Sequence, residues 1–208
     1  MSADTDWPEL DLGTPAALQL VRVSVPLRHP HVWAGGSTSV RDVVLVAWTR
    51  PDGAVGWGEC PTLEGYVTGA TGPAWDALVS LGPSLLAGNL RAGPVGTWTG
   101  SAAAPTAALG AVADAALDAA LRAAGRPMAE FFGGSSVPLS RTAVVGGPSA
   151  GADERVAAAL EAEDAGAVCV KLKVDAATPP AVVGAVLDAV GSVAVDANGT
   201  LGQQRAAE

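Results

Sequence analysis

The sequence predicts an α+β domain followed by the first three βα units of an incomplete TIM-type (β/α) barrel. Two alternating runs on either side of Pro51-Asp52-Gly53 predict an antiparallel hairpin. From residue 138 onward, strand and helix patterns alternate, which is typical of a parallel sheet with covering helices. The strands expected at 168–174 and 192–196 are apolar on one face only. Sheets covered on both faces have strands that are apolar throughout, so this pattern favours a barrel with a polar interior mouth.

Composition narrows the class of protein and of partner. The chain has 208 residues, of which 49% are hydrophobic and 16% charged, and its net charge is −9. This charge argues against nucleic acid and anionic membrane surfaces as partners. The acidic N-terminus lacks the features of a signal peptide, and apolar runs are too short to span a membrane, so we expect a cytoplasmic protein. Two isolated cysteines make neither a disulfide framework nor a zinc site.

The first part of the chain is expected to be a small sheet followed by helices. The predicted strands are 18–26, 41–50 and 54–59, and the predicted helices are 75–86 and 106–124. Residues 1–15 are predicted to be a loose leader, and 27–39, with Pro, Gly, Ser and Thr, a loop. Thr106 is the expected N-cap of the second helix, and Gly125 its C′ residue. The run Gly133-Gly134-Ser135-Ser136 predicts a domain boundary, with one domain at 16–134 and the other at 135–208.

The second part of the chain is expected to be strand, helix, strand throughout. The predicted strands are 138–145, 168–174 and 192–196, and the predicted helices are 150–165, 179–190 and the start of one at 202–208. Consecutive strands joined by helices are parallel neighbours, so their carboxyl ends meet at one edge of the sheet.

Polar side chains stand at that edge. Because side chains alternate along a strand, Lys171 and Lys173 share one face of the first strand, and Asp196 and Asn198 share one face of the next. Two buried ammonium groups disfavour each other's charged form, so one of them becomes usable as a proton acceptor. Asp196 is a hard oxygen ligand suited to Mg²⁺. The alternative is that both lysines are solvated residues that protect an edge strand from aggregation.

These residues resemble the enolase superfamily, and within it the muconate-lactonizing-enzyme-like subgroup that holds o-succinylbenzoate synthases and N-acylamino acid racemases. The matching motifs are Arg41-Asp42-Val43-Val44-Leu45-Val46, Gly56-Trp57-Gly58-Glu59-Cys60, the stretch 115–134, Val170-Lys171-Leu172-Lys173 and Val195-Asp196-Ala197-Asn198. The resemblance covers essentially the whole chain. It implies that residues 16–134 are a capping domain and that the barrel bears the active site.

The resemblance also implies roles for the matched residues. Lys173 would be the general acid/base that removes the proton α to a carboxylate, and Lys171 would tune it and help hold the developing charge. Asp196 would be the first of three carboxylate ligands of Mg²⁺, and Asn198 would lie beside the metal and the substrate carboxylate. These roles agree with the needs of an enediolate, which are a divalent cation and a nearby base.

Further expectations concern specificity and partners. The segment 27–39 would fold over the barrel mouth, where His31 and Trp33 would line the site, unless they serve ordinary loop packing. The implied partner is a small carboxylate substrate, and the implied parent enzyme is a homo-oligomer. The implied activity is that of an o-succinylbenzoate synthase, with N-acylamino acid racemase or a related epimerase as the alternative.

Chain length departs from the family pattern. Eight βα units need about 250 residues, whereas about 70 come after the predicted boundary. The two later metal carboxylates and the opposing lysine of the family are not found in these residues. We therefore expect a fragment of a longer enzyme that is inactive and poorly soluble by itself, or else an interaction module of another class.

Overall fold

A computed structural model of the chain describes residues 10–33, 36–63, 69–92, 98–99, 105–134, 137–146, 150–197 and 201. Contacts divide the chain into two compact units, each of which is described by itself. The first unit comprises Met1–His29 and Ser39–Ser136, and the second comprises Pro30–Thr38 and Val137–Glu208. The predicted assignment of leader, capping domain and barrel domain to these stretches stays a prediction.

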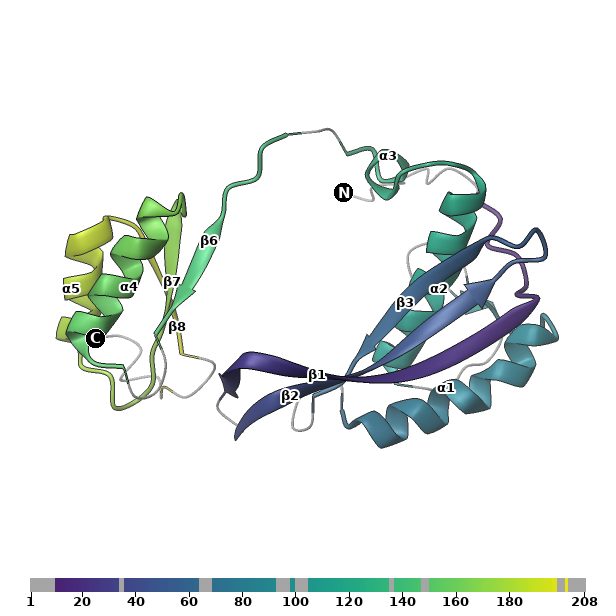
Figure 1. Ribbon diagram of the computed structural model, residues 1–208, viewed down its shortest axis with the longest axis horizontal. Coiled ribbons are helices and arrows are strands. Elements are labelled where there is room, and N and C mark those ends of the chain that lie inside the picture. Colours follow the sequence, from purple (N-terminus) through teal and green to yellow (C-terminus); the bar gives the residue numbers. More distant parts are fainter. Residues whose placement is uncertain are drawn as a thin grey trace. The chain divides into compact units, whose positions relative to one another are not determined.

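A three-stranded sheet in the order β1-β2-β3 is built from Ala17–Trp33, Gly36–Thr49 and Val55–Pro61 (Figure 1). β2 and β3 pair antiparallel, with Trp48 opposite Gly56, which confirms the predicted hairpin. The prediction of a loop at 27–39 was wrong, because β1 runs on to Trp33 and β2 begins at Gly36. β1 lies at the edge of this sheet, the position in which strands accommodate prolines such as Pro30.

Helix α2, Thr106–Ala123, packs on β3 at very short range. A Cβ placed on Gly56 would lie 2.1 Å from the Ala119 nitrogen, and one on Gly58 would lie 1.9 Å from the Ala111 oxygen. Glycine on the strand and alanine on the helix therefore let the two backbones approach, and larger side chains do not fit. Trp48, fully buried, belongs to the core that forms between these elements.

The first unit also contains α1 Thr71–Leu86, β4 Arg91–Ala92, β5 Trp98–Thr99 and α3 Met128–Phe131. Residues of α1 and α3 join this core. Leu12 is buried as well, although it lies in the predicted leader. Gly125 comes after α2 with φ +62°, as expected for a C′ glycine. Thr106 was wrongly predicted as the N-cap, because Pro105 holds that position and no side chain caps the helix.

The second unit is a parallel sheet in the order β6-β7-β8 (Figure 1). Its elements are β6 Thr142–Val145, α4 Ala152–Asp164, β7 Cys169–Lys173, α5 Pro180–Val190 and β8 Val193–Asp196. Both helices cover the same face of the sheet, as the crossovers of a barrel do. The predicted fold class is confirmed: an α+β unit is followed by the first strands of an incomplete TIM-type barrel.

The helix predicted at 202–208 lies outside the described residues. Among the residues that the structure describes, no helix is long and apolar enough to cross a membrane.

Candidate active site

The two faces of β7 differ sharply in polarity. Val170 and Leu172 are buried beneath α4 and α5, with exposed fractions of 2% and 0%. Lys171 and Lys173 occupy the alternate positions and therefore point away from the helices. In the parallel register Lys173 lies opposite Asp196 of β8, which places this carboxylate on the same face. The polar face expected from the sequence thus exists, at the carboxyl end of the sheet.

A three-residue cluster forms there, which we call the lysine–aspartate cluster: Lys171, Lys173 and Asp196. The Nζ atoms of Lys171 and Lys173 lie 2.7 and 2.9 Å from the same oxygen, Asp196 Oδ2. The side chains are only partly exposed, at 42%, 25% and 20% respectively. One carboxylate therefore serves two ammonium groups, and the cluster has a formal charge of +1. The structure brings together three of the predicted site residues; their roles in a reaction stay predictions.

The donor set does not by itself fit Mg²⁺. This ion takes near-octahedral oxygen coordination, usually from one or two carboxylates together with water and substrate oxygens. Within the described ranges, no group of three or more His, Cys, Asp or Glu side chains is placed to hold a metal. Asp196 supplies one carboxylate, whose Oδ2 already accepts from both lysines. Asn198, the other predicted polar residue of this edge, lies outside the described residues.

The two predicted specificity residues are on β1. His31 is exposed, and the side chain of Trp33 is among those that the structure does not describe. Both fall in Pro30–Thr38, which belongs to the second unit. Their part in substrate binding stays a prediction.

The turn after β7 is held by its own side chains. The Thr178 hydroxyl donates to Asp175 Oδ1 at 2.9 Å and accepts from the Asp175 N–H at 3.1 Å. The hydroxyl of Thr178 and nearby backbone N–H groups hold the pKa of Asp175 below its ordinary value, and the positive charge of Arg155 acts in the same direction. These contacts favour the ionised form of Asp175, which follows β7 in sequence and is not a member of the cluster.

Two signals in the sequence were missed. Lys171 and Lys173 are the only lysines in the chain, because the other ten of its 12 basic residues are arginines. Arg155 is a basic residue in the first turn of a helix, where the helix dipole favours acidic ones. It is also buried, with an exposed fraction of 5%. The two lysines among arginines, and the buried arginine near the start of a helix, both point to positions where that particular side chain has a role.

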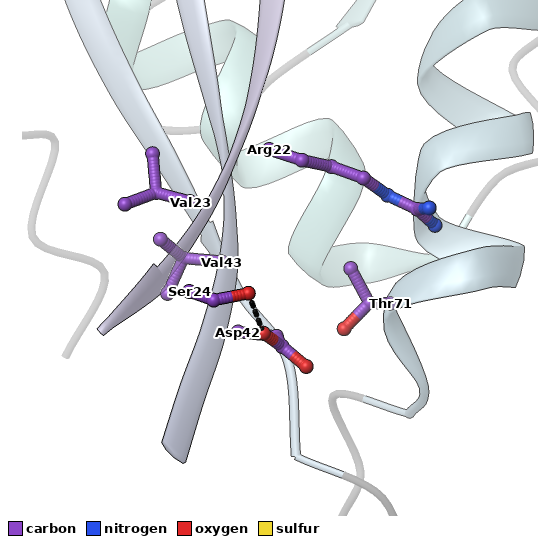
Figure 2. A pocket seen from close by; sticks show the side chains of 6 residues that line it. All are labelled: Arg22, Val23, Ser24, Asp42, Val43 and Thr71. Carbon is purple, nitrogen blue, oxygen red and sulfur yellow. Dashed lines mark hydrogen bonds between the residues drawn. The ribbon is translucent and has the colours of Figure 1, made fainter. Parts of the chain in front are cut away.

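A second candidate site lies in the first unit, between β1, β2 and the start of α1 (Figure 2). This hollow of about 310 Å³ is lined by Arg22, Val23, Ser24, Asp42, Val43 and Thr71. Ser24 Oγ donates to Asp42 Oδ1 at 2.5 Å, and the Arg22 guanidinium lies 5.3 Å from the centre of the Trp75 ring. Because these polar groups already have partners within the first unit, they give less reason to expect a ligand than the lysine–aspartate cluster does.

Comparison with known proteins gives structural neighbours only. No protein-family model and no curated protein sequence matches the chain. A mandelate racemase/muconate lactonizing protein from Herpetosiphon aurantiacus superposes with a TM-score of 0.77 at 22% identity, over 95% of this chain and 56% of that one. A dipeptide epimerase from Enterococcus faecalis V583, complexed with Mg and the dipeptide L-Leu-L-Tyr, gives 0.76 at 19% identity, over 93% and 56%. An enolase superfamily member from Listeria innocua gives 0.74 at 21% identity, over 90% and 52%.

The neighbours confirm the predicted resemblance at the level of fold. The chain shares its fold with part of these mandelate racemase/muconate lactonizing, dipeptide epimerase and enolase superfamily structures. It spans a little over half the length of these structures.

Proposed function

We propose that this chain supplies the general base of an enzyme that removes the proton α to a carboxylate. The observation that carries the proposal is the lysine–aspartate cluster, in which both lysines of the chain bind one carboxylate oxygen at the carboxyl ends of parallel strands. This edge is where (β/α) barrels hold their catalytic side chains. The fold shared with the racemase and epimerase neighbours is consistent with the proposal.

The restriction of lysine to this cluster supports proton transfer rather than charge alone. Arginine keeps its proton at any ordinary pH, whereas a lysine amine can lose and regain one. If positive charge were all that was needed at positions 171 and 173, arginine would serve, as it does at the chain's other basic positions. A role in binding an anion would accept either residue, so proton transfer is favoured.

In the proposed step, Lys173 reacts as the neutral amine: its Nζ takes the α-proton and becomes an ammonium, while the C–H electron pair moves into the carboxylate and forms an enediolate. Lys171, two residues earlier on the same face, helps to hold the developing negative charge. Asp196 would supply one oxygen ligand of Mg²⁺, an ion that the described residues alone do not hold. When bound, this ion stabilises negative charge on the substrate carboxylate. Because both lysines use Asp196 Oδ2, a cation on this oxygen would compete with them for it.

Two reactions share this step and differ in the fate of the enediolate. In the finer proposal, an o-succinylbenzoate synthase, loss of hydroxide from a cyclohexadiene carboxylate completes a dehydration toward menaquinone. A racemase or epimerase would instead return a proton from a second base on the opposite face of the substrate. The Mg-bound dipeptide epimerase among the neighbours favours this second candidate. Asn198, His31 and Trp33 would contact the substrate in either case, and the working enzyme would be a homo-oligomer.

The test is α-proton exchange in D₂O, because it detects the step that both reactions share. The product of the complete gene is incubated with N-acylamino acids, dipeptides and the cyclohexadiene carboxylate, with and without Mg²⁺. We expect Mg²⁺-dependent deuterium incorporation or dehydration that Lys173→Ala abolishes. Loss of dehydration would identify the synthase, and loss of racemisation the epimerase. If no substrate exchanges its α-proton before mutation, the proposal fails and an interaction module is favoured.

A further inference from the structure

Arg155 is a buried cation on α4, close to the carboxyl end of the sheet. Arg155 has an exposed fraction of 5%. Buried arginines are rare because moving their charge out of water costs free energy. Such a residue persists only where hydrogen bonds compensate for the loss of hydration. Its contacts therefore indicate what it is there to hold.

The guanidinium joins two segments by hydrogen bonds to backbone carbonyls. Arg155 Nε donates to the Ala150 oxygen at 2.8 Å, and Nη1 donates to the Lys173 oxygen at 2.5 Å. Gly146, the residue after β6, has φ +92°, and a Cβ built on it would lie 3.0 Å from Arg155 Nη1. The same Cβ would lie 3.2 Å from the Lys173 oxygen. Glycine at 146 thus leaves the space in which Arg155 reaches β7.

The pairing of β7 explains why Lys173 needs this contact and Lys171 does not. Lys171 is paired on both sides, with Val144 of β6 and with Ala194 of β8. The pairing with β6 ends at Leu172, so Lys173 is paired only with Asp196 of β8. On the β6 side, Arg155 Nη1 supplies a hydrogen bond to the Lys173 carbonyl where the strand ladder has stopped.

We propose that Arg155 is a positioning residue for Lys173. By holding the Lys173 carbonyl, it fixes the backbone from which Nζ reaches Asp196 Oδ2. This inference rests on the proposed function of Lys173 as a base, since it says how that base is kept in place. Arg155 acts through Lys173 and has no direct part in the proton transfer.

The two lysines provide the measurement. Because the chain has no others, amine-selective labelling followed by mass spectrometry reports only on Lys171, Lys173 and the N-terminus. Labelling rates are measured on the 208-residue chain, before and after Arg155→Met and Arg155→Lys. We expect Arg155→Met to raise the ratio of the Lys173 rate to the Lys171 rate about threefold or more, because the end of β7 opens locally. Arg155→Lys keeps the charge but reaches one carbonyl, so an intermediate ratio is expected. The amine that this variant adds on α4 is resolved from Lys171 and Lys173 by mass spectrometry of the labelled peptides.

A matched control is Arg141→Gln. Arg141 also lies in the second unit and also donates from its guanidinium to a backbone carbonyl, that of Ala165, but it is exposed and precedes β6. We expect no change in the lysine ratio for this variant. A purely structural role of Arg155 would raise both lysine rates together or lower the melting temperature without changing their ratio, and either result overturns the proposal.

Two further outcomes keep the test decisive. If Arg155→Met does not fold, the conservative Arg155→Lys carries the test, and a ratio equal to that of the unmodified chain overturns the proposal. The readout requires no turnover, so it separates the two claims. A changed ratio without α-proton exchange by the complete gene product upholds the positioning and rejects the proposed function. α-Proton exchange by the complete gene product, with an unchanged ratio of the Lys173 and Lys171 labelling rates, supports the proposed function and rejects the positioning role of Arg155.

Discussion

The two units of the chain differ in how much of their own surface they bury. Among the described residues, the core cluster of the first unit contains 21 buried residues, and that of the second contains five. In the first unit, α2 and β3 meet with glycine against alanine, and the core is closed by residues from several elements. In the second, Val144 and Val195 stand 62% and 51% exposed on opposite faces of the sheet.

The difference in packing between the two units determines where each can hold a charged, reactive group. Polar side chains cannot enter a closely packed alanine and glycine interface without a loss of stability. A sheet covered on one face leaves the other face for charged groups, and the lysine–aspartate cluster occupies it. The first unit thus has a large, closely packed core, whereas the second has a small core on one face of its sheet and charged side chains on the other. Substitutions in each unit test this contrast, beginning with the largest effect.

Gly58→Ala is expected to destabilise the first unit most, by about 3 kcal/mol or more, because the new methyl group would lie 1.9 Å from the Ala111 oxygen. Urea unfolding followed by tryptophan fluorescence measures this, since five of the six tryptophans belong to the first unit. Gly110→Ala, on the open side of α2, is the control and should gain about 0.5–1 kcal/mol. Equal midpoints for Gly58→Ala and the unmodified chain would contradict the close packing.

Leu172→Ala should damage the second unit alone. Leu172 is fully buried in the five-residue cluster, so its truncation is expected to cost about 2–5 kcal/mol. We expect lysine labelling to reach the rate of an unfolded chain while the tryptophan signal of the first unit is retained. Leu187→Ala, at an exposed position on α5, should change neither signal. Simultaneous loss of both signals would show that the units do not unfold separately.

Asp196→Asn should have a smaller effect on stability and a specific effect on the lysines. The ion pairs are partly exposed, so their loss is expected to cost about 1 kcal/mol or less. Labelling of both Lys171 and Lys173 should rise, because an amide cannot hold two ammonium groups. Asp188→Asn, an exposed carboxylate on α5, is the control. Unchanged labelling in Asp196→Asn would exclude the shared ion pair.

The smallest expected effect is a pair of opposite pH dependences within the first unit. Partial desolvation raises the pKa of Asp114 above its ordinary value of 3.8, although the residue stands exposed on α2, so a small part of the stability is lost as pH rises from 3.8 through the folded pKa. Hydrogen bonds from the Ala54 N–H and the Arg50 side chain lower the pKa of Asp52, so it stabilises the fold above 3.8.

Asp114→Asn should therefore raise stability at pH 7 and leave it unchanged at pH 3. Asp52→Asn should lower stability at pH 7, with the difference vanishing as pH falls through the folded pKa. Melting temperatures of the two variants between pH 3 and 7 check the signs. Shifts of the same sign in both variants would contradict these environments.

Local patterns predicted the site better than they predicted the first sheet. The alternation in 168–174 places Val170 and Leu172 on one face and the lysines on the other, and the structure has them so. The parallel register of β7 and β8 then sets Lys173 opposite Asp196. The strand at 27–33 could not be predicted, because prolines and a glycine-rich stretch argue for a loop unless the strand is known to be an edge.

Arg155 shows why the rest of the site was not predictable. Arg155 is buried, and its guanidinium donates to the carbonyl of Lys173, 18 residues further along the chain. No local pattern in the sequence encodes that contact. Spacing identifies the face on which a side chain stands, whereas a long-range hydrogen bond depends on how α4 packs on the sheet. The close approach of Gly58 to Ala111 is of the same kind.

The role of Lys173 as the base is tested most directly by replacing it with arginine in the complete gene product and measuring α-deuterium incorporation in D₂O. Arginine keeps the positive charge and a donor for Asp196 but does not release its proton. We predict a loss of about a thousandfold or more in exchange rate, with folding and lysine labelling at position 171 preserved. An exchange rate within about tenfold of the unmodified enzyme would show that charge suffices at position 173 and would contradict its role as the base.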